Sequence, residues 1–478
     1  MQMGKSHLPR SGNAPDGGMA LKSSADKACG AIPSVIAPYG AEYEWIRLRD
    51  LSVRITKGTT PTKGQGFVEH GINYIKSESI TADGSIDVSK FAYIDSETHS
   101  KLARSQLCAG NVLFSMAGVY LGKTAVVLPE HLPANTNQAV GIISLNEQVA
   151  DPYFIHYALQ SPACRDWVLR SASQSAQPNF NLQEIGDLKI PALSLASQKN
   201  IASVLRALDD RIALLRETNA TLEAMAQALF KSWFVDFDPV HANTGTQTAT
   251  LPPELQTLFP ATFTASPQGP VPEGWAWGTI ADAVETVGGA TPDTKNDEFW
   301  NPAEVAWTSP KDLSGLNTPV LLDTERKVSE KGLAKISSGL LPTGSLLMSS
   351  RAPIGYLAIA QIPLAINQGY IAMPPGGRLP PLYMLFWCRQ NMEVIKNRAN
   401  GSTFMEISKK AFRPIELVLP PVEVIEAFVN VAQPLFDRLV ENEKQAQTLA
   451  TLRDTLLPRL ISGQLRLPEA EAQLTEVV

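Results

Sequence analysis

The sequence has few of the features that mark membrane, secreted or metal-binding proteins. No stretch approaches the roughly 18 consecutive apolar residues of a membrane-spanning helix, and the polar first residues contain no apolar core of a secretory signal. The 4 cysteines stand far apart without a CxxC pair, which predicts neither a zinc site nor a disulfide framework; they are Cys29, Cys108, Cys164 and Cys388. We therefore expect a cytoplasmic protein that holds no metal.

An excess of charge of one sign is also missing. Charged residues make up 18% of the chain, and 41 Lys and Arg stand against 47 Asp and Glu, for a net charge of −6. This balance excludes a histone-like polycation and an acidic disordered chain. With 44% apolar residues over 478 positions, the chain can form about two to four domains, each with its own core.

Repeated catalytic groups are absent too. The 6 histidines all lie at residue 241 or earlier, whereas a duplicated enzyme should repeat its general base. Neither HExxH nor GxSxG occurs. The Asn/Asp-Pro-Pro-aromatic signature of methyltransferases is missing, because Asp151-Pro152-Tyr153 lacks a second proline and is typical of a helix start. We expect no catalytic residue and no cofactor bound by this chain.

One segment looks like a nucleotide-binding loop. Residues 117–124 read AGVYLGKT, a relaxed P-loop pattern with Ala in place of the first Gly. A P-loop needs a strand before it and a helix after it, but here AVVLP follows, which predicts a strand that ends at Pro129. A bend between two strands is the better interpretation. A nucleotide-driven enzyme that uses Lys123 stays open as an alternative.

The sequence does contain a long internal repeat. The two copies open at Trp45 and Trp275, a period too long for a solenoid, whose units are about 20–50 residues. The matching motifs keep the same order in both copies: Gly58-Thr-Thr-Pro61 with Gly289-Ala-Thr-Pro292, Ile72–Lys76 with Val305–Thr308, Gly110–Ser115 with Gly344–Ser349, and Asn137-Gln138 with Asn367-Gln368. The repeat indicates a whole folding unit used twice.

Each copy reads as an α+β domain. Short β-branched or aromatic runs alternate with Gly, Pro, Asn and Ser turns, and a helical patch follows at about 151–171 and 380–398. The segment between the copies is rich in Thr, Pro, Ala and Gln and predicts a linker. The predicted divisions are a disordered leader 1–40, domains 41–193 and 271–420, long helices 194–237 and 421–463, a linker 238–270 and a tail 464–478.

The two long helical stretches carry the clearest periodicity. Apolar residues recur at alternating spacings of four and three, and Ile201 and Phe428 occupy the same place in seams that keep one constant offset. A period of 3.5 over several heptads indicates a coiled coil; the alternative is two unrelated core helices. The predicted helix–helix contacts are Ile201, Leu208, Leu215, Asn219, Leu222, Leu435, Leu439, Asn442, Leu449 and Leu456.

The seam also predicts a direction and a register. Domains at opposite ends of the pair require the helices to run antiparallel, because each helix leaves its own domain. A buried asparagine is costly without a polar partner, so we expect Asn219 opposite Asn442. In that register Leu208 faces Arg453, whose guanidinium should then reach outward to water.

This arrangement of domains and helices resembles the specificity subunit of type I restriction–modification complexes over about residues 42–463. The resemblance is carried by the Gly-x-Thr-Pro motifs, the Gly110 and Gly344 turns and the repeated Asn-Gln. Ile190-Pro191 before Gln198–Ile201, and Leu456–Gln464 at the end of the second helix, also fit. Two departures are Glu423-Val424, where the family has Glu-Gln, and the additional leader.

The resemblance implies a non-catalytic DNA-recognition subunit. Two target-recognition domains would each read one half of a split, asymmetric sequence in double-stranded DNA. The helices would fix the gap and dock two methyltransferase subunits that use S-adenosylmethionine, and restriction subunits that use ATP and Mg would join them. A non-catalytic coiled-coil scaffold remains the alternative.

The net charge of the two domains does not by itself predict DNA binding. Residues 42–150 hold 10 Lys and Arg against 11 Asp and Glu, and residues 271–420 hold 14 against 14. Base reading needs Arg, Lys, Asn, Gln, Ser or Thr on loops. We predict DNA contacts at Lys57, Thr59, Thr60, Lys63, Lys76, Gln174, Gln177, Asn179 and Asn181, and at Thr291, Lys295, Lys311, Ser350, Arg351, Arg398, Asn400, Ser402 and Thr403. The repeated Asn-Gln pairs more often satisfy backbone groups.

Overall fold

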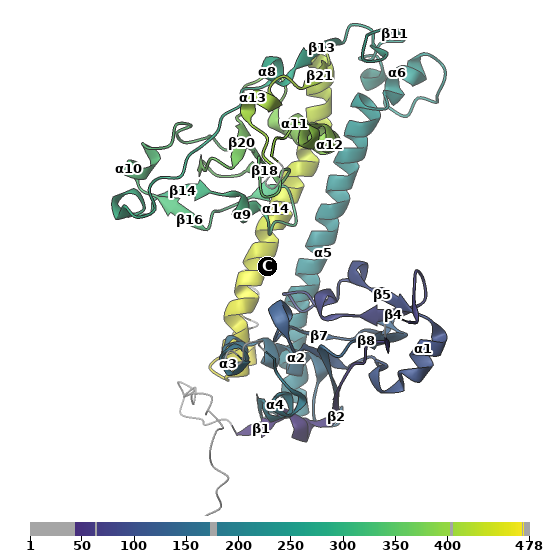
Figure 1. Cartoon of the computed structure of the whole chain (residues 1–478), viewed down its shortest axis with the longest axis vertical. Helices are drawn as coiled ribbons and strands as arrows, with labels where there is room; N and C mark the ends of the chain where they lie inside the picture. Colours follow the sequence, from purple (N-terminus) through teal and green to yellow (C-terminus); the bar gives the residue numbers. More distant parts are fainter. Residues whose placement is uncertain (1–43, 63–64, 173–178, 402–404, 471, 473–478) are drawn as a thin grey trace, which may run out of the picture. The chain divides into compact units, whose positions relative to one another are not determined.

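The computed structural model describes residues 44–62, 65–172, 179–401, 405–470 and 472, and they form two compact units (Figure 1). The first unit comprises residues 44–202 and 457–472 of this range, and the second comprises 203–456. In the described part of the chain, no helix combines the length and the apolar character needed to cross a membrane.

The first unit contains two four-stranded sheets. One is antiparallel in the order β2-β9-β6-β7, and the other has the order β3-β5-β4-β8 with β4 and β8 parallel. The buried side chains of Ile75, Leu113 and Ile142 belong to one apolar cluster, which joins the sheets. The strands are β1 Trp45–Arg47, β2 Ser52–Lys57, β3 Phe67–Val68, β4 Ile72–Ile75, β5 Ala92–Ile94, β6 Val112–Ser115, β7 Thr124–Val126, β8 Ala134–Thr136, β9 Val140–Leu145 and β10 Lys189–Pro191.

Helices close the first domain where the sequence predicts them. Pro152 opens a helix, and the Asp151 side chain caps it by accepting hydrogen bonds from the N–H groups of Tyr153 and Phe154. The helical patch is therefore confirmed. The helices are α1 Ser96–Lys101, α2 Pro152–Gln160, α3 Pro162–Ala172 and α4 Leu182–Asp187.

The second unit repeats this plan. Its sheets have the orders β16-β14-β19 and β15-β18-β17-β20. The trio β16-β14-β19 has one antiparallel and one parallel neighbour, as does β5-β4-β8 in the first unit. The strands are β11 Phe263–Thr264, β12 Val271–Pro272, β13 Ala276–Thr279, β14 Val305–Thr308, β15 Val320–Leu321, β16 Arg326–Val328, β17 Leu346–Ser349, β18 Leu357–Ala360, β19 Ala365–Ile366, β20 Tyr370–Met373 and β21 Glu416–Leu419.

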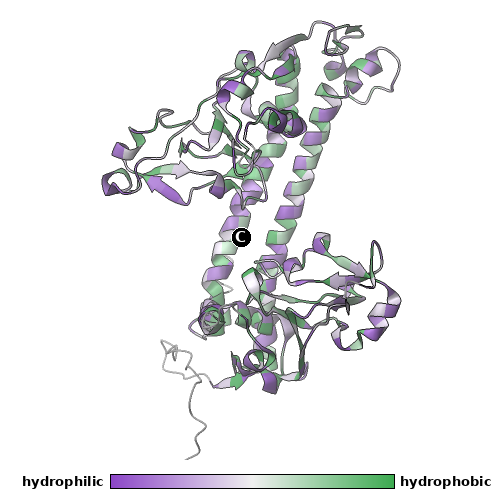
Figure 2. Ribbon diagram, viewed as in Figure 1, coloured by the Kyte–Doolittle hydropathy of each residue, from purple (hydrophilic) through white to green (hydrophobic). Residues whose placement is uncertain are grey.

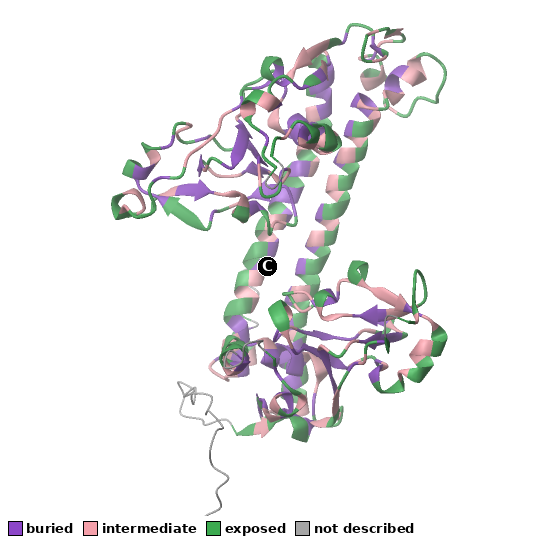
Figure 3. Ribbon diagram, in the orientation of Figure 1, coloured by how far each residue is buried: buried purple, intermediate pink, exposed green. Residues whose placement is uncertain are grey.

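One large core holds the second unit together. Met348 of the sheet, Tyr383 of α11, Phe230 of α5 and Phe428 of α14 belong to a single buried cluster, and the buried strands stand out in Figure 3. The expected α+β domain is confirmed. Its helices are α6 Asp238–Asn243, α7 Pro253–Gln256, α8 Ile280–Ala283, α9 Pro310–Leu313, α10 Glu330–Leu333, α11 Pro381–Gln390, α12 Met392–Asn397 and α13 Lys409–Phe412.

The two long helices, α5 (Leu195–Phe234) and α14 (Val422–Ile461), pack antiparallel within the second unit. The rings of Trp233 and Phe428 lie 6.2 Å apart near one end of the contact. Near the other end, Asp209 and Arg453 form an ion pair of 2.6 Å. Polar and apolar residues are interspersed along both helices (Figure 2). The helices contact each other through their apolar seams. The predicted antiparallel pair is confirmed.

The predicted register is confirmed as well. Asn442 Nδ2 donates to Asn219 Oδ1 at 2.9 Å, and Asn219 Nδ2 donates to the Leu439 carbonyl at 3.3 Å. Both asparagines are at most 1% exposed. The expectation for Arg453 was incomplete, since its guanidinium does not simply reach water. It pairs with Asp209, next to buried Leu208, and is 16% exposed.

The segment predicted as a linker is folded. Residues 238–270 contain α6, α7 and β11, and Phe259 packs edge-on against Trp233 with ring centroids 5.1 Å apart. Phe263 contacts Phe237 in the same way at 6.1 Å. The proline and threonine content suggested a linker, but four aromatic side chains supply enough apolar surface to fix the segment.

The predicted leader, residues 1–40, lies outside the described residues. In the predicted tail, Leu465 and Ala470 are buried in the first unit.

Candidate nucleic-acid interface

In the first domain, the Gly-x-Thr-Pro motif is fastened to the Asn-Gln motif. The N–H of Thr59 donates to the Thr136 carbonyl at 2.9 Å, and the hydroxyl of Thr60 donates to the side-chain oxygen of Gln138. Gly58 permits this approach, because a Cβ there would overlap the Thr136 carbonyl oxygen. We call the threonine–glutamine pair, with its flanking glycine, the Thr–Gln clasp.

The second domain builds the same clasp from the equivalent residues of the second copy. The N–H of Ala290 donates to the Ile366 carbonyl at 3.1 Å, and the Thr291 hydroxyl donates to Gln368 Oε1 at 2.7 Å. A Cβ on Gly289 would overlap the Ile366 carbonyl oxygen. The repeated motifs are therefore a structural junction between two loops that are far apart in sequence.

The asparagine and the glutamine of each pair have separate roles. Asn137 Oδ1 accepts from the N–H of Ala139 at 3.2 Å, and Asn367 Oδ1 accepts from the N–H of Gly369 at 2.8 Å. The expectation that these pairs satisfy backbone groups is confirmed for the asparagines. The glutamines instead lie exposed at the clasp.

An aromatic side chain holds each clasp in place through a hydrogen bond to a backbone carbonyl of its loop. The Tyr74 hydroxyl donates to the Thr59 carbonyl at 3.0 Å, and burial raises the pKa of that hydroxyl, which keeps it protonated. In the second domain, Trp307 Nε1 donates to the Ala290 carbonyl at 3.2 Å. Tyr74 and Trp307 occupy the same place in β4 and β14, so the anchor is part of the repeated plan.

Predicted contacts in the second domain gather around this clasp. Trp300 Nε1 donates to the Asp293 carbonyl at 3.0 Å, which fixes the loop that carries Thr291 and Lys295. Lys311 lies near the same edge and pairs with Glu325 at 2.8 Å. That carboxylate raises the pKa of the Lys311 ammonium. Thr291, Lys295 and Lys311 are exposed.

A second group of predicted contacts is joined to the Gln368 loop through Gly369. The N–H of Ser350 donates to the Gly369 carbonyl at 2.8 Å, and Arg351 pairs with Glu406 at 3.8 Å. Asn400 also bonds to Glu406 through the backbone. Ser350 itself is only 2% exposed, so its side chain has no surface for the contact we predicted. The chain turns inward at the end of β17, which a local pattern does not reveal.

The remaining predicted contacts are scattered. Lys57 and Arg398 are exposed, and Lys76 pairs with Glu78 at 3.4 Å. Asn181 caps α4 by accepting from two backbone N–H groups, so its oxygen serves the fold. Asn179 is exposed and forms a β-bridge with Ala117. Lys63, Gln174, Gln177, Ser402 and Thr403 lie outside the described residues.

The segment that looks like a nucleotide-binding loop is a bend. It joins β6 to β7, which are antiparallel neighbours, and only a short 3-10 turn (Gly118–Tyr120) lies between them. No helix follows Lys123, whose ammonium lies 5.0 Å from the centroid of the Tyr120 ring. The predicted bend between two strands is confirmed.

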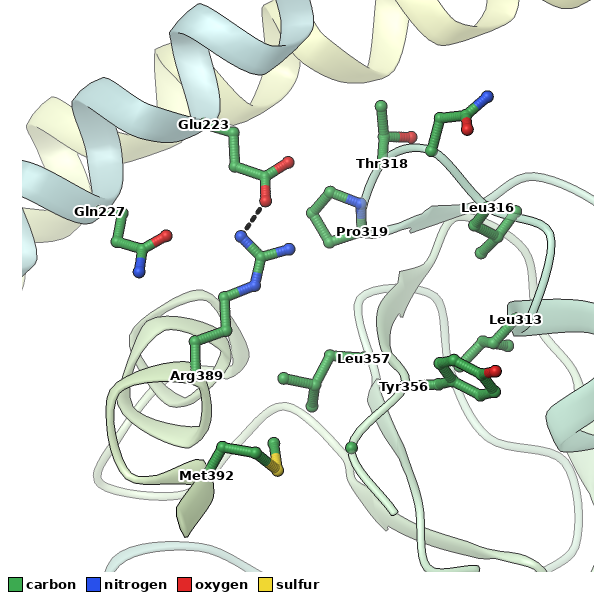
Figure 4. A pocket seen from close by; sticks show the side chains of 12 residues that line it. Glu223, Gln227, Leu313, Leu316, Thr318, Pro319, Tyr356, Leu357, Arg389 and Met392 are labelled. Carbon is green, nitrogen blue, oxygen red and sulfur yellow. Dashed lines mark hydrogen bonds and ion pairs between the residues drawn. The ribbon is translucent and has the colours of Figure 1, made fainter. Parts of the chain in front are cut away.

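A cavity of about 420 Å³ opens where the second domain meets α5. Glu223 on α5 and Arg389 on α11 form an ion pair across it, as Figure 4 shows. Both side chains are less than a quarter exposed. Because Thr318 also bonds to Glu443 of α14 at 3.3 Å, the domain is tied to both helices. Among the described residues, no group of three or more His, Cys, Asp or Glu could hold a metal ion.

Sequence reasoning missed one charged residue of the second domain's edge. Arg326 is exposed at the start of β16 and lies over the ring of Trp300. The two adjacent basic residues Arg326-Lys327 could have suggested a DNA contact. The position of Arg326 beside the clasp, however, follows only from the pairing of β16 with β14.

Comparison with known proteins agrees with this repeated plan. Two segments, residues 41–224 and 272–451, match the family described as type I restriction modification DNA specificity domain. The chain is 36% identical over 179 residues to the specificity subunit of the type I restriction enzyme MjaIX of Methanocaldococcus jannaschii, covering 37% of this chain but only 41% of that protein. It is 26% identical over 368 residues to the HindI specificity subunit of Haemophilus influenzae, covering 68% and 80% of the two chains.

A solved structure shares the fold. The type I restriction–modification S subunit from M. genitalium matches with a TM-score of 0.51 and 17% identity, over 88% of this chain and 96% of that one. The family matches cover both copies of the repeat and most of each long helix. The chain therefore belongs to the family of type I restriction–modification specificity subunits.

Proposed function

We propose that this chain gives a type I restriction–modification complex its DNA sequence specificity by binding a bipartite, asymmetric target. The observation that carries the proposal is the clasp built twice. Thr60–Gln138 and Thr291–Gln368 form the same junction, yet the residues beside it differ. Arg326 lies opposite Trp307 where Ala92 lies opposite Tyr74. A common scaffold with different exposed side chains suits two domains that read different half-sites.

The chain itself has no catalytic role in this proposal. The bend at Lys123 lacks the helix that phosphate binding needs. Burial raises the pKa of the Cys164 thiol to about 12, so that sulfur is a poor nucleophile. S-adenosylmethionine, ATP and Mg would be bound by partner subunits.

The partners are double-stranded DNA, two methyltransferase subunits and the restriction subunits. The near-balanced charge of both domains supports the idea that this chain reads bases while its partners contact much of the phosphate backbone. With few excess positive charges, this chain would release few counterions on binding DNA. The long helices would set the gap between half-sites and offer their outer faces to the methyltransferases.

Methylation sequencing tests the proposal most simply. Cells that lack other methylases should gain adenine methylation at one split motif when this chain is expressed with its methyltransferase partner. The purified chain alone should neither methylate nor cut DNA in the presence of S-adenosylmethionine or ATP. A coiled-coil scaffold would produce no motif, and a nucleotide-driven enzyme would hydrolyse ATP without partners.

A further inference from the structure

A cationic side chain stacks on an indole ring at the edge of the second domain. Arg326 begins β16, which is exposed beside the buried strand β14 (Figure 3). The guanidinium carbon lies 3.6 Å from the centroid of the Trp300 ring and 5.3 Å from that of Trp307. Contact at this distance is a cation–π contact, and it restrains the Arg326 side chain.

The stack is fixed in place before any ligand binds. The two indoles meet edge to face, with centroids 5.3 Å apart, and both N–H groups donate to carbonyls of the loop 290–293. Arg326 is the direct cross-strand neighbour of Trp307, and its carbonyl accepts from the Thr324 hydroxyl at 2.8 Å. An arginine held this way has less rotamer freedom to lose on binding.

No residue in the described part of the chain forms a hydrogen bond or an ion pair with the guanidinium of Arg326. Within the described residues, its guanidinium forms no ion pair with a carboxylate, because the adjacent Glu325 pairs with Lys311 instead. A guanidinium that contacts an aromatic ring through its face keeps its in-plane N–H groups available for hydrogen bonds. That geometry matches the two acceptors of guanine, O6 and N7, in the major groove.

The first domain shows that the stack is not part of the common scaffold. Tyr74, the counterpart of Trp307, has Ala92 as its cross-strand neighbour at the place of Arg326. Phe67 meets Tyr74 edge to face at 5.2 Å, as Trp300 meets Trp307. The aromatic platform is therefore repeated, whereas the position of Arg326 is taken by Ala92 in the first domain. A residue that varies on a constant platform is where specificity is expected.

We infer that Arg326 reads a guanine in the half-site bound by the second domain. The inference rests on the proposed function and adds the chemistry of one contact. A bidentate arginine–guanine contact discriminates against other bases by about 5- to 150-fold. Trp300 is a positioning residue, since it holds the guanidinium without touching the base.

The test is methylation sequencing of complexes that contain the full chain with Arg326→Ala, Arg326→Gln or, as a matched control, Lys327→Ala. Lys327 is the next residue of β16, is exposed and carries the same charge, but lies outside the stack. We expect wild type to require guanine at one position of one half-site. Both Arg326 variants should relax that position alone, while Lys327→Ala keeps the full motif.

The outcomes separate the inference from the function beneath it. An unchanged motif with uniformly weaker methylation in Arg326→Ala would make Arg326 a phosphate contact and overturn the inference. So would a wild-type motif in Arg326→Gln, because the guanidinium would then not be needed to select guanine. Relaxation in Lys327→Ala would also overturn it. Absence of any split motif with the wild-type chain would overturn the proposed function as well.

Discussion

Gly289 shows how little room the clasp leaves at the residue scale. A Cβ there would overlap the Ile366 carbonyl oxygen, and backbone cannot move aside as a flexible side chain can. We expect Gly289→Ala to destabilise the second unit by about 3 kcal/mol, the upper range for overpacking. The lowered thermal unfolding midpoint of the purified chain measures it.

Gly315 supplies the matched control in the same unit. A Cβ on Gly315 would meet nothing within 4 Å, so Gly315→Ala should change stability by no more than about 0.5 kcal/mol. Equal effects of the two substitutions would show that the clasp tolerates a side chain at Gly289.

Residue-scale prediction from sequence succeeded where the signal was local. Asn137 and Asn367 satisfy a backbone N–H two residues ahead, as short polar side chains in turns do. The prediction of a DNA contact at Ser350 was wrong, because its burial depends on a hydrogen bond to Gly369, which is distant in the sequence. Arg326 was missed because only strand pairing sets it opposite Trp307.

At the scale of elements, the buried asparagine pair fixes how α5 and α14 meet. Asn219→Leu leaves the amide of Asn442 without its partner, and an unpaired buried amide costs about 1–3 kcal/mol. The double variant Asn219→Leu with Asn442→Leu should recover most of that loss, since apolar replacement of both partners is nearly neutral. Denaturation midpoints of the three variants measure the coupling.

Asn430 is exposed on α14 and serves as the control. Asn430→Leu should leave the midpoint within the range of ordinary surface substitutions. A double variant as unstable as the sum of its single variants would mean that the two asparagines act independently, against the hydrogen bond of 2.9 Å.

The ion pair between Glu223 and Arg389 ties the second domain to α5 (Figure 4). A double-mutant cycle with Glu223→Gln and Arg389→Gln should give a coupling of about 1 kcal/mol, since both groups are largely removed from solvent. The exposed pair Lys444–Glu441, 2.7 Å apart, should couple by less than about 0.5 kcal/mol. Equal coupling in the two cycles would remove any special role for the partly buried pair Glu223–Arg389.

Elements were predictable where a single periodicity governs them. The long helices follow from a seam of period 3.5, and a buried Asn in each seam was enough to set the register. The segment 238–270 differs from the prediction because its prolines and threonines outnumber its two phenylalanines, Phe259 and Phe263, in the composition. The contacts of Phe259 with Trp233 and Trp275 are tertiary and leave no local pattern.

At the scale of the whole molecule, the long helices, which we propose set the gap between the half-sites, can be lengthened. Inserting four residues into each long helix extends it by about 6 Å, or roughly two base pairs. Methylation sequencing should then report a motif with the same half-sites and a longer gap. An unchanged gap would show that the helices do not set the spacing.

The central claim is that each domain reads one half of the target. Exchange of residues 271–420 for the equivalent domain of another member of the family, followed by methylation sequencing of the assembled complex, tests it most directly. We predict that one half of the methylated motif changes and the other half stays as in the wild type. A change in both halves, or in neither, would contradict two independent recognition domains.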